Sequence, residues 1–321
     1  MNSNYLEEVI SESTALIAAF EYEKARAILE EAFKANPSNI KIIDLISDVY
    51  FNVDNIEGAC KMIKKSISLD PNHNPEKYMT FGQLVPDLKV SIQSYKKGIE
   101  LFKKELKKEN SNDKEIKKAI ASGYASIAEK YMTTDLCLEK DAEDIVEDSI
   151  KEGFIYDENS IDLLCQLANV RIIRGRDKEA EIALNKIYDM IIEKEDNEDN
   201  TQERAENLPD KEIIKNVAKN YAEIQNYEKA IDVFELLISI DDLDLEAWYL
   251  LSYCNYQLSN YIDAYECLDK LSKSQKKVSQ EEKDTIYKDV IESAIELYNA
   301  ILSKLGNVPK IDDDNEDEEM Q

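Results

Sequence analysis

Few residues of this 321-residue chain have the types and spacing that catalysis requires. Its one histidine, His73, stands in a proline- and asparagine-rich segment that predicts a solvated turn. The closest glycines, Gly82 and Gly98, are sixteen residues apart, so neither a GxGxxG fingerprint nor a P-loop is present. The cysteines show no CxxC spacing and predict reduced, half-buried thiols; they are Cys60, Cys137, Cys165, Cys254 and Cys267. We therefore expect no enzyme, no cofactor and no metal site.

The strong negative charge of this sequence is the feature that indicates which partners it could bind. The chain has 68 acidic and 40 basic residues, a formal net charge of −28. Nucleic acid is therefore a poor partner, because phosphate binding needs a positive surface, and a basic protein is a better one. Carboxylates pair with Lys and Arg, and tyrosine rings stack on guanidinium groups. The candidate partner-binding residues, which we expect on the inner surface of the array described below, are Asp44, Asp48, Glu76, Glu129, Asp162, Glu212, Glu223, Glu246, Tyr249, Tyr253 and Tyr256. The alternative is that the charge serves solubility and the tyrosines pack.

The scarcity of turn residues predicts which elements position these side chains. Seven Gly and six Pro are far fewer than average composition supplies, and a sandwich or barrel needs such residues in its tight turns. An all-α protein is expected. No apolar run approaches eighteen residues, and no basic region precedes an apolar stretch near Met1. We therefore expect neither a membrane span nor secretion.

A 34-residue period indicates the architecture. Tyr-Glu-Lys-Ala occurs at 22–25 and 227–230, and Tyr-Ile-Asp-Ala at 261–264 follows the second copy by 34 residues. The same spacing separates Ala25 from Ala59 and also Leu29 from Ile63, Ala32 from Ser66 and Pro37 from Pro71. Small residues at fixed positions let the two helices of a hairpin cross closely, and each hairpin leaves an apolar face that the next one covers. This period is typical of tetratricopeptide repeats, which predicts a right-handed superhelical solenoid.

About seven helical hairpins and a C-terminal capping helix can be placed. The predicted organisation is repeats 1–3 over 1–105, a charged helical linker over 106–118, repeats 4–5 over 119–192, an acidic disordered loop over 193–210, repeats 6–7 over 211–275, the capping helix over 279–306 and an acidic disordered tail over 307–321. Ser279 and Glu282 predict a capping box at the start of the capping helix. The lysines at 103–108 fit a solvated helix extension, with a nuclear-import signal as the alternative.

The residues of one known tetratricopeptide binding mode are missing from this sequence. A chaperone-tail clamp grips a C-terminal carboxylate with lysine and asparagine on its first helix. The equivalent positions here hold Ile10, Thr14, Asp44 and Asp48, and a displaced clamp at Lys215 and Lys219 lacks the asparagine. Recognition by an acidic groove is therefore favoured over a co-chaperone role.

One segment resembles a particular family. Tyr131-Met132-Thr133-Thr134-Asp135-Leu136-Cys137, followed by acidic residues around Ala142, is similar to a stretch in the dedicated assembly chaperones of the fourth large-subunit ribosomal protein (uL-four). Phe81-Gly82-Gln83-Leu84 and Leu167-Ala168-Asn169-Val170-Arg171 extend the similarity. The second threonine and the acidic insert depart from the family pattern. From the residues alone, Thr133 and Asp135 are expected to bond turn amides, and Leu136 and Cys137 to be buried.

The resemblance implies that the chain captures a newly made basic ribosomal protein, keeps it soluble and delivers it to pre-ribosomes. It also implies a cytoplasmic and nuclear location. We expect a monomer without direct nucleic-acid or membrane contact. The alternative is a tetratricopeptide scaffold subunit of a multiprotein complex, or a co-chaperone.

Overall fold

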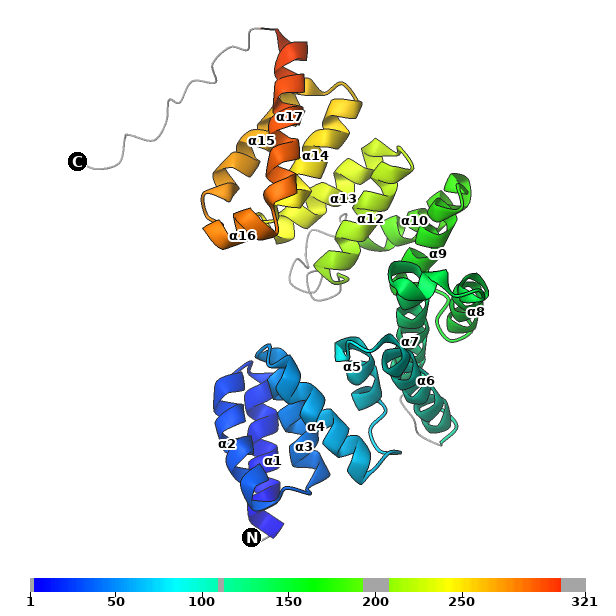
Figure 1. Cartoon of the computed structure of the whole chain (residues 1–321), viewed down its shortest axis with the longest axis vertical. Helices are drawn as coiled ribbons and strands as arrows, with labels where there is room; N and C mark the ends of the chain where they lie inside the picture. Colours follow the sequence, from blue (N-terminus) through cyan, green and yellow to red (C-terminus); the bar gives the residue numbers. More distant parts are fainter. Residues whose placement is uncertain (1–2, 109–112, 193–207, 307–321) are drawn as a thin grey trace, which may run out of the picture. The chain divides into compact units, whose positions relative to one another are not determined.

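The computed structural model describes residues 3–108, 113–192 and 208–306. These residues form helices joined by turns, and no strand occurs among them, which confirms the all-α fold class. The chain divides into two compact units, 1–166 and 167–321, which are coloured in sequence order in Figure 1. The division falls inside helix α9 (Ile161–Ile173), within the fifth predicted repeat, and not at the predicted linker or loop.

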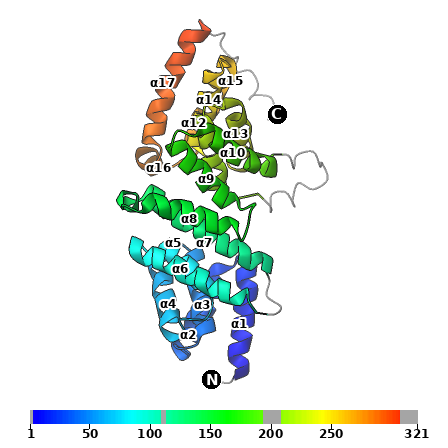
Figure 2. The ribbon, with the colours of Figure 1, turned by 90° about the vertical axis from the view of Figure 1, so that its right-hand side faces the viewer.

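The first unit contains four hairpins in sequence. Its helices are α1 (Ser3–Ala18), α2 (Tyr22–Ala35), α3 (Ile40–Asn52), α4 (Ile56–Leu69), α5 (Glu76–Leu84), α6 (Leu88–Glu105), α7 (Asp113–Thr133), the short 3₁₀ helix η1 (Asp135–Leu138) and α8 (Ala142–Phe154). Each odd-numbered helix packs against the next helix to form a hairpin, and the second helix of one hairpin also packs against the first helix of the next (Figure 2). The hairpins therefore stack in the order of the sequence.

The second unit repeats this arrangement. After α9 it contains α10 (Asp177–Ile191), α12 (Lys211–Glu223), α13 (Tyr227–Ile240), α14 (Leu245–Gln257), α15 (Tyr261–Gln275), α16 (Gln280–Thr285) and α17 (Lys288–Leu305). Helices α12 and α13 form one hairpin, α14 and α15 the next, and α17 packs against α14 and α15. Ala294, Leu297 and Ile301 of α17 join the core of the last hairpin, as expected of a capping helix.

The repeated alanines lie in the core of their hairpins. Ala25, Ala59, Ala230 and Ala264 have no exposed surface. A small side chain at these positions lets the two helices of a hairpin approach closely, and larger apolar residues one turn further along fill the space between neighbouring hairpins. The 34-residue register predicted from the sequence is confirmed at these positions.

The hairpin turns share one backbone conformation. One residue in each of five turns has a positive φ between 58° and 66°: Phe20, Asp54, Gly175, Gln225 and Ser259. The amide of the following residue donates to a carbonyl five residues earlier, for example Asn226 N to Tyr221 O at 2.9 Å and Asn260 N to Asn255 O at 2.9 Å. This is the hydrogen bond of a Schellman turn, which usually places glycine at the left-handed position. Here only one of the five turns has glycine.

Two boundaries differ from the predicted organisation. The predicted capping helix is two helices, because α16 ends at Thr285 and α17 begins at Lys288, and the backbone leaves the helical conformation at Tyr287. The predicted capping box is present, but it caps the short α16, with the Ser279 hydroxyl accepting from the Glu282 amide. In the predicted linker, residues 113–118 belong to α7. The predicted disordered segments lie outside the described residues, except for 208–210.

The cysteines and His73 show no reactive geometry. The cysteines are unpaired, and burial raises the pKa values of Cys165, Cys254 and Cys267 to about 12, so these remain thiols near neutral pH. His73 is exposed. Across residues 3–108, 113–192 and 208–306, no group of His, Cys, Asp and Glu has the geometry to hold a metal ion, and no helix is long and apolar enough to cross a membrane.

Candidate functional site

The candidate residues lie on the first helices of successive hairpins. Within each unit, we call the side of these helices that carries the candidate residues the first-helix face; it comprises α3, α5 and α7 in the first unit and α12 and α14 in the second. Asp162 lies on α9, at the end of the first unit. The structure brings some of the predicted residues into clusters. The two units differ in how many of their candidate carboxylates form ion pairs with lysine.

Asp44, Asp48 and Glu76 form one group, which we call the N-terminal carboxylate cluster. Within it, Asp44 is tied to its own unit: the Ser66 hydroxyl donates to Asp44 Oδ1 at 2.5 Å, and the Asn74 side-chain Nδ2 donates to Asp44 Oδ2 at 3.2 Å. His73 Nε2 lies 3.7 Å from the same Oδ2 atom. The side chain of Asp44 is only 14% exposed. These contacts give Asp44 a structural role, which the sequence pattern did not indicate.

Asp48 and Glu76 are the open part of the cluster. Asp48 is exposed, but neighbouring protein atoms still desolvate its carboxylate, and the charges of Asp44 and Glu76 repel it. Together these effects raise the pKa of Asp48 to about 6. In the described part of the chain no Lys or Arg forms an ion pair with either Asp48 or Glu76. A cation placed here would relieve a repulsion that is already present in the folded protein.

The remaining carboxylates of the first unit stand apart from this cluster. The Glu129 side chain is exposed on α7, and its charge adds to the effect of burial that raises the pKa of Tyr95 on α6. Asp162 is half-buried, and burial raises its pKa although the Ser122 hydroxyl bonds to it. No hydrogen bond or ion pair joins Glu129 and Asp162 in the described structure, so they are separate candidates.

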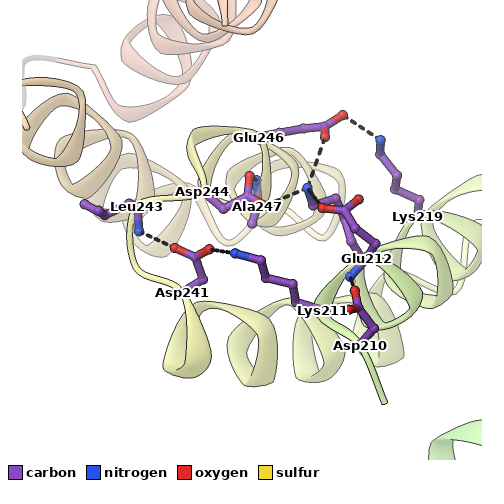
Figure 3. Close-up of polar contacts among 10 residues, drawn as sticks. Asp210, Lys211, Glu212, Lys219, Asp241, Leu243, Asp244, Glu246 and Ala247 are labelled. Atoms are coloured by element: carbon purple, nitrogen blue, oxygen red, sulfur yellow. Dashed lines mark hydrogen bonds and ion pairs between the residues drawn. The ribbon is translucent and has the colours of Figure 1, made fainter. Parts of the chain in front are cut away.

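In the second unit, lysines of α12 meet carboxylates at the end of α13, at the start of α14 and on α12 itself (Figure 3). Lys211, Lys215 and Lys219 follow one another at intervals of four residues, so they lie on one side of the helix. Their ion pairs are Lys211 Nζ with Asp241 at 2.6 Å, Lys215 Nζ with Asp244 at 2.8 Å and with Glu212 at 3.2 Å, and Lys219 Nζ with Glu246 at 2.6 Å. We call this row the lysine ladder.

The lysine ladder neutralises part of the predicted inner surface. Lys215 and Asp244 are 13% and 9% exposed, so this pair is shielded from water. Burial alone would lower the pKa of Lys215, but the hydrogen bond and charge of Asp244, with those of Glu212, raise it. Glu212 and Glu246 therefore offer less free negative charge than the sequence suggests. Lys215 and Lys219 are both held in ion pairs within the unit, which argues against a displaced carboxylate clamp.

The predicted tyrosines are partly packing residues. Tyr249, Tyr253 and Tyr256 are half-buried against the core of the last hairpin. The ring of Tyr253 lies edge-on to Tyr227 at 6.3 Å, and Tyr227 is also close to the charge of Glu223. These contacts favour the packing alternative for Tyr253, while a smaller part of each of the three tyrosines stays exposed.

The run at 131–137 forms the turn between α7 and α8. Thr134, and not Thr133 or Asp135, makes the expected turn bond, with its hydroxyl accepting from the Leu136 amide at 3.3 Å. Leu136 is buried as expected, but Cys137 is exposed, so the expectation of a buried thiol is wrong there. The 3₁₀ helix η1 turns the chain so that only one residue of its Leu-Cys pair reaches the core.

Comparison with known proteins gives matches over a single repeat and over most of the chain. A model of the tetratricopeptide repeat family matches residues 40–73, which hold α3 and α4. A curated protein of Schizosaccharomyces pombe named "Probable assembly chaperone of rpl4" is 26% identical over 309 residues, which cover 90% of this chain and 88% of that protein. A protein of Emericella nidulans with the same name is 24% identical over 263 residues, 77% of this chain and 63% of that protein.

Solved structures share the fold. The structure described as "Assembly Chaperone of RpL4 (Acl4) (Residues 1-338)" superposes with a TM-score of 0.68 and 22% identity, covering 79% of this chain and 96% of that one. The Cut9–Hcn1 hetero-tetramer of the APC/C superposes with a TM-score of 0.59 and 14% identity, covering 90% of this chain and 48% of the other. Together with the repeat match, these similarities support a tetratricopeptide array.

Proposed function

We propose that this chain is a dedicated chaperone of ribosomal protein rpl4, which it captures on its first-helix face and keeps soluble until assembly. The main support for this proposal is the similarity to the Schizosaccharomyces pombe protein, which extends over 90% of this chain and 88% of the relative. Such coverage includes the repeats and their connections, whereas a shared repeat alone would leave the partner open. Delivery to pre-ribosomes, and hence a cytoplasmic and nuclear location, belongs to the same proposal.

The N-terminal carboxylate cluster supplies the recognition chemistry in this proposal. Asp48 and Glu76 present negative charge that no ion pair within the described structure offsets, and the charge of Asp44 acts on Asp48 as well. A lysine or arginine of the cargo would stabilise the ionised form of Asp48 and lower its pKa. Binding and proton release are therefore linked, so affinity for a basic segment should decrease as the pH falls below about 6.

The proposal is tested by purifying the full-length tagged chain and identifying bound proteins by mass spectrometry. We expect rpl4 as the dominant partner. Recovery of a stable multiprotein complex without rpl4 would instead support a scaffold subunit. The double variant Asp48→Lys, Glu76→Lys should lose rpl4, because it reverses both open carboxylates and leaves Asp44 intact. Its matched control is Glu31→Lys, Glu57→Lys, which makes the same charge change at exposed positions of second helices α2 and α4.

Two further experiments, added salt and deletion of the acidic tail, distinguish binding at the first-helix face from binding at the tail. Binding to the carboxylate cluster should weaken with added salt, because charges are screened beyond about 8 Å at physiological ionic strength. Deleting the residues from Asp312 onward should mainly slow association at low salt, since distant charge steers an encounter without making shaped contacts. If binding survives the double reversal and is lost on tail deletion, recognition lies in the tail and the first-helix mechanism is wrong.

A further inference from the structure

A second acidic surface lies on the other side of the hairpins in the second unit. A pocket of about 770 Å³ opens between the second helices α13 and α15, with α14 beneath it, and the three helices are neighbours in Figure 1. None of the candidate first-helix residues lines this pocket. We call it the outer pocket. A ligand here and a cargo on the first-helix face would therefore use different residues.

The outer pocket combines an apolar floor with acidic edges. Its floor includes Ile231, Ile238 and the half-buried Trp248. Carboxylates line it from both second helices: Glu228, Asp232 and Glu235 from α13, and Asp263 and Glu266 from α15. Among the described residues of the lining, Lys270 is the one basic residue. An apolar floor with charge of one sign along both edges is the complement of a basic amphipathic segment.

The charge at the outer pocket differs from that of the lysine ladder. In the ladder, each carboxylate meets a lysine of the same unit. At the outer pocket, Tyr188 donates to Asp232 at 2.6 Å, a contact that leaves the negative charge in place. Within the described structure, Glu228 and Glu266 form no ion pair, and both are exposed. Glu228 and Glu266 thus keep negative charge beside the apolar floor of the pocket.

We infer that the outer pocket docks a basic amphipathic helix of a second protein, one distinct from the cargo of the first-helix face. The apolar side chains of that helix would enter between α13 and α15, and its lysines or arginines would pair with Glu228 and Glu266. Because the two surfaces do not share residues, the second protein can bind while the cargo is held. The inference does not depend on the identity of the cargo.

Trp248 makes the pocket directly observable, because it is the only tryptophan of the chain. The probe is an 18-residue, tryptophan-free peptide of leucine and lysine whose leucines recur at helical spacing. A control peptide has the same composition with the leucines scrambled, so it carries equal charge without an apolar face. We expect the amphipathic peptide to change Trp248 emission saturably, and the scrambled peptide to do so at least about tenfold more weakly, a factor equal to about 1.4 kcal/mol.

Paired variants of the full chain separate docking from general attraction to an acidic protein. Glu228→Lys, Glu266→Lys should weaken peptide binding at least about tenfold, again about 1.4 kcal/mol. Glu292→Lys, Glu296→Lys makes the same charge change at exposed positions of α17 outside the pocket and should change binding by less than about twofold, or about 0.4 kcal/mol. Circular dichroism confirms that both variants are folded. Equal weakening by both pairs would overturn the inference.

The last experiment repeats the peptide binding in the presence of the cargo. The peptide should produce the same Trp248 response with chain that is already loaded with rpl4. If rpl4 itself changes Trp248 emission, blocks the peptide and loses affinity with Glu228→Lys, Glu266→Lys, the outer pocket is a second contact for the cargo and the inferred partner is wrong. The Asp48→Lys, Glu76→Lys variant should bind the peptide normally, so failure of the proposed function and failure of this inference give different results.

Discussion

The Ser66 hydroxyl on α4 donates a 2.5 Å hydrogen bond to the Asp44 carboxylate on α3, which joins the two helices of one hairpin across the core. Ser66 is fully buried, and the buried Lys77 donates to the same hydroxyl oxygen at 3.2 Å. One of the acids predicted for partner binding is therefore also part of the packing of its hairpin.

This bond predicts that Asp44 and Asp48 respond differently to substitution. Asp44→Ala should lower the free energy of unfolding by about 1.5–3 kcal/mol, because it removes a charged acceptor from Ser66 and Asn74. Asp48→Ala, one turn further along α3, should not destabilise the protein. Urea unfolding followed by circular dichroism measures both changes, and equal midpoints for the two variants would contradict the structural role of Asp44.

Asp48 predicts a pH-dependent stability. Its pKa rises from 3.8 to about 6 in the folded protein, so between these pH values the native state binds more protons than the unfolded state. The contribution of Asp48 therefore becomes less favourable as the pH rises through this window. Asp48→Asn should raise stability at pH 7 by about 0.5–1 kcal/mol, a figure reduced for the exposure of the side chain. At pH 3.5 the gain should vanish; a gain that persists there would exclude ionisation as its cause.

The lysine ladder predicts unequal roles for neighbouring lysines. Lys215→Ala should cost about 3–5 kcal/mol, because it leaves the buried carboxylate of Asp244 without its cation. Lys219→Ala should cost less than about 1 kcal/mol, since Lys219 is 40% exposed and its pair with Glu246 is open to water. Thermal and urea unfolding of the two variants provide the comparison, and similar losses would mean that burial does not set the strength of these pairs.

The buried alanines predict a steric effect at the helix crossing. Ala230→Phe should destabilise the second unit by about 1–3 kcal/mol, because the fully buried position has no room for a ring. Ala27→Phe places the same side chain at an exposed position of α2 and serves as the control. An unchanged melting temperature for Ala230→Phe would contradict the repeat register.

Sequence periodicity predicted the fold because the hairpin crossing demands the same small residue at each recurrence, as at Ala25 and Ala59. It placed the candidate acids on first helices for the same reason. It did not reveal that Lys215 meets Asp244, since that contact depends on how two neighbouring hairpins are rotated against each other. The interruption at Tyr287 was also hidden, because no glycine or proline marks it. Periodicity thus predicts which face a residue occupies, while its charge partner depends on packing.

The left-handed turns are positions at which this protein could be made more stable by substitution. A residue with a side chain in that conformation costs roughly 1–2 kcal/mol, whereas glycine adopts it freely and loses only about 0.5–1 kcal/mol through its greater freedom in the unfolded chain. Gln225 and Ser259 therefore hold positions where glycine would be neutral or stabilising. Neither residue belongs to the first-helix face or lines the outer pocket. Glycine at these positions could therefore stabilise successive hairpins one turn at a time and leave the first-helix face and the outer pocket unchanged.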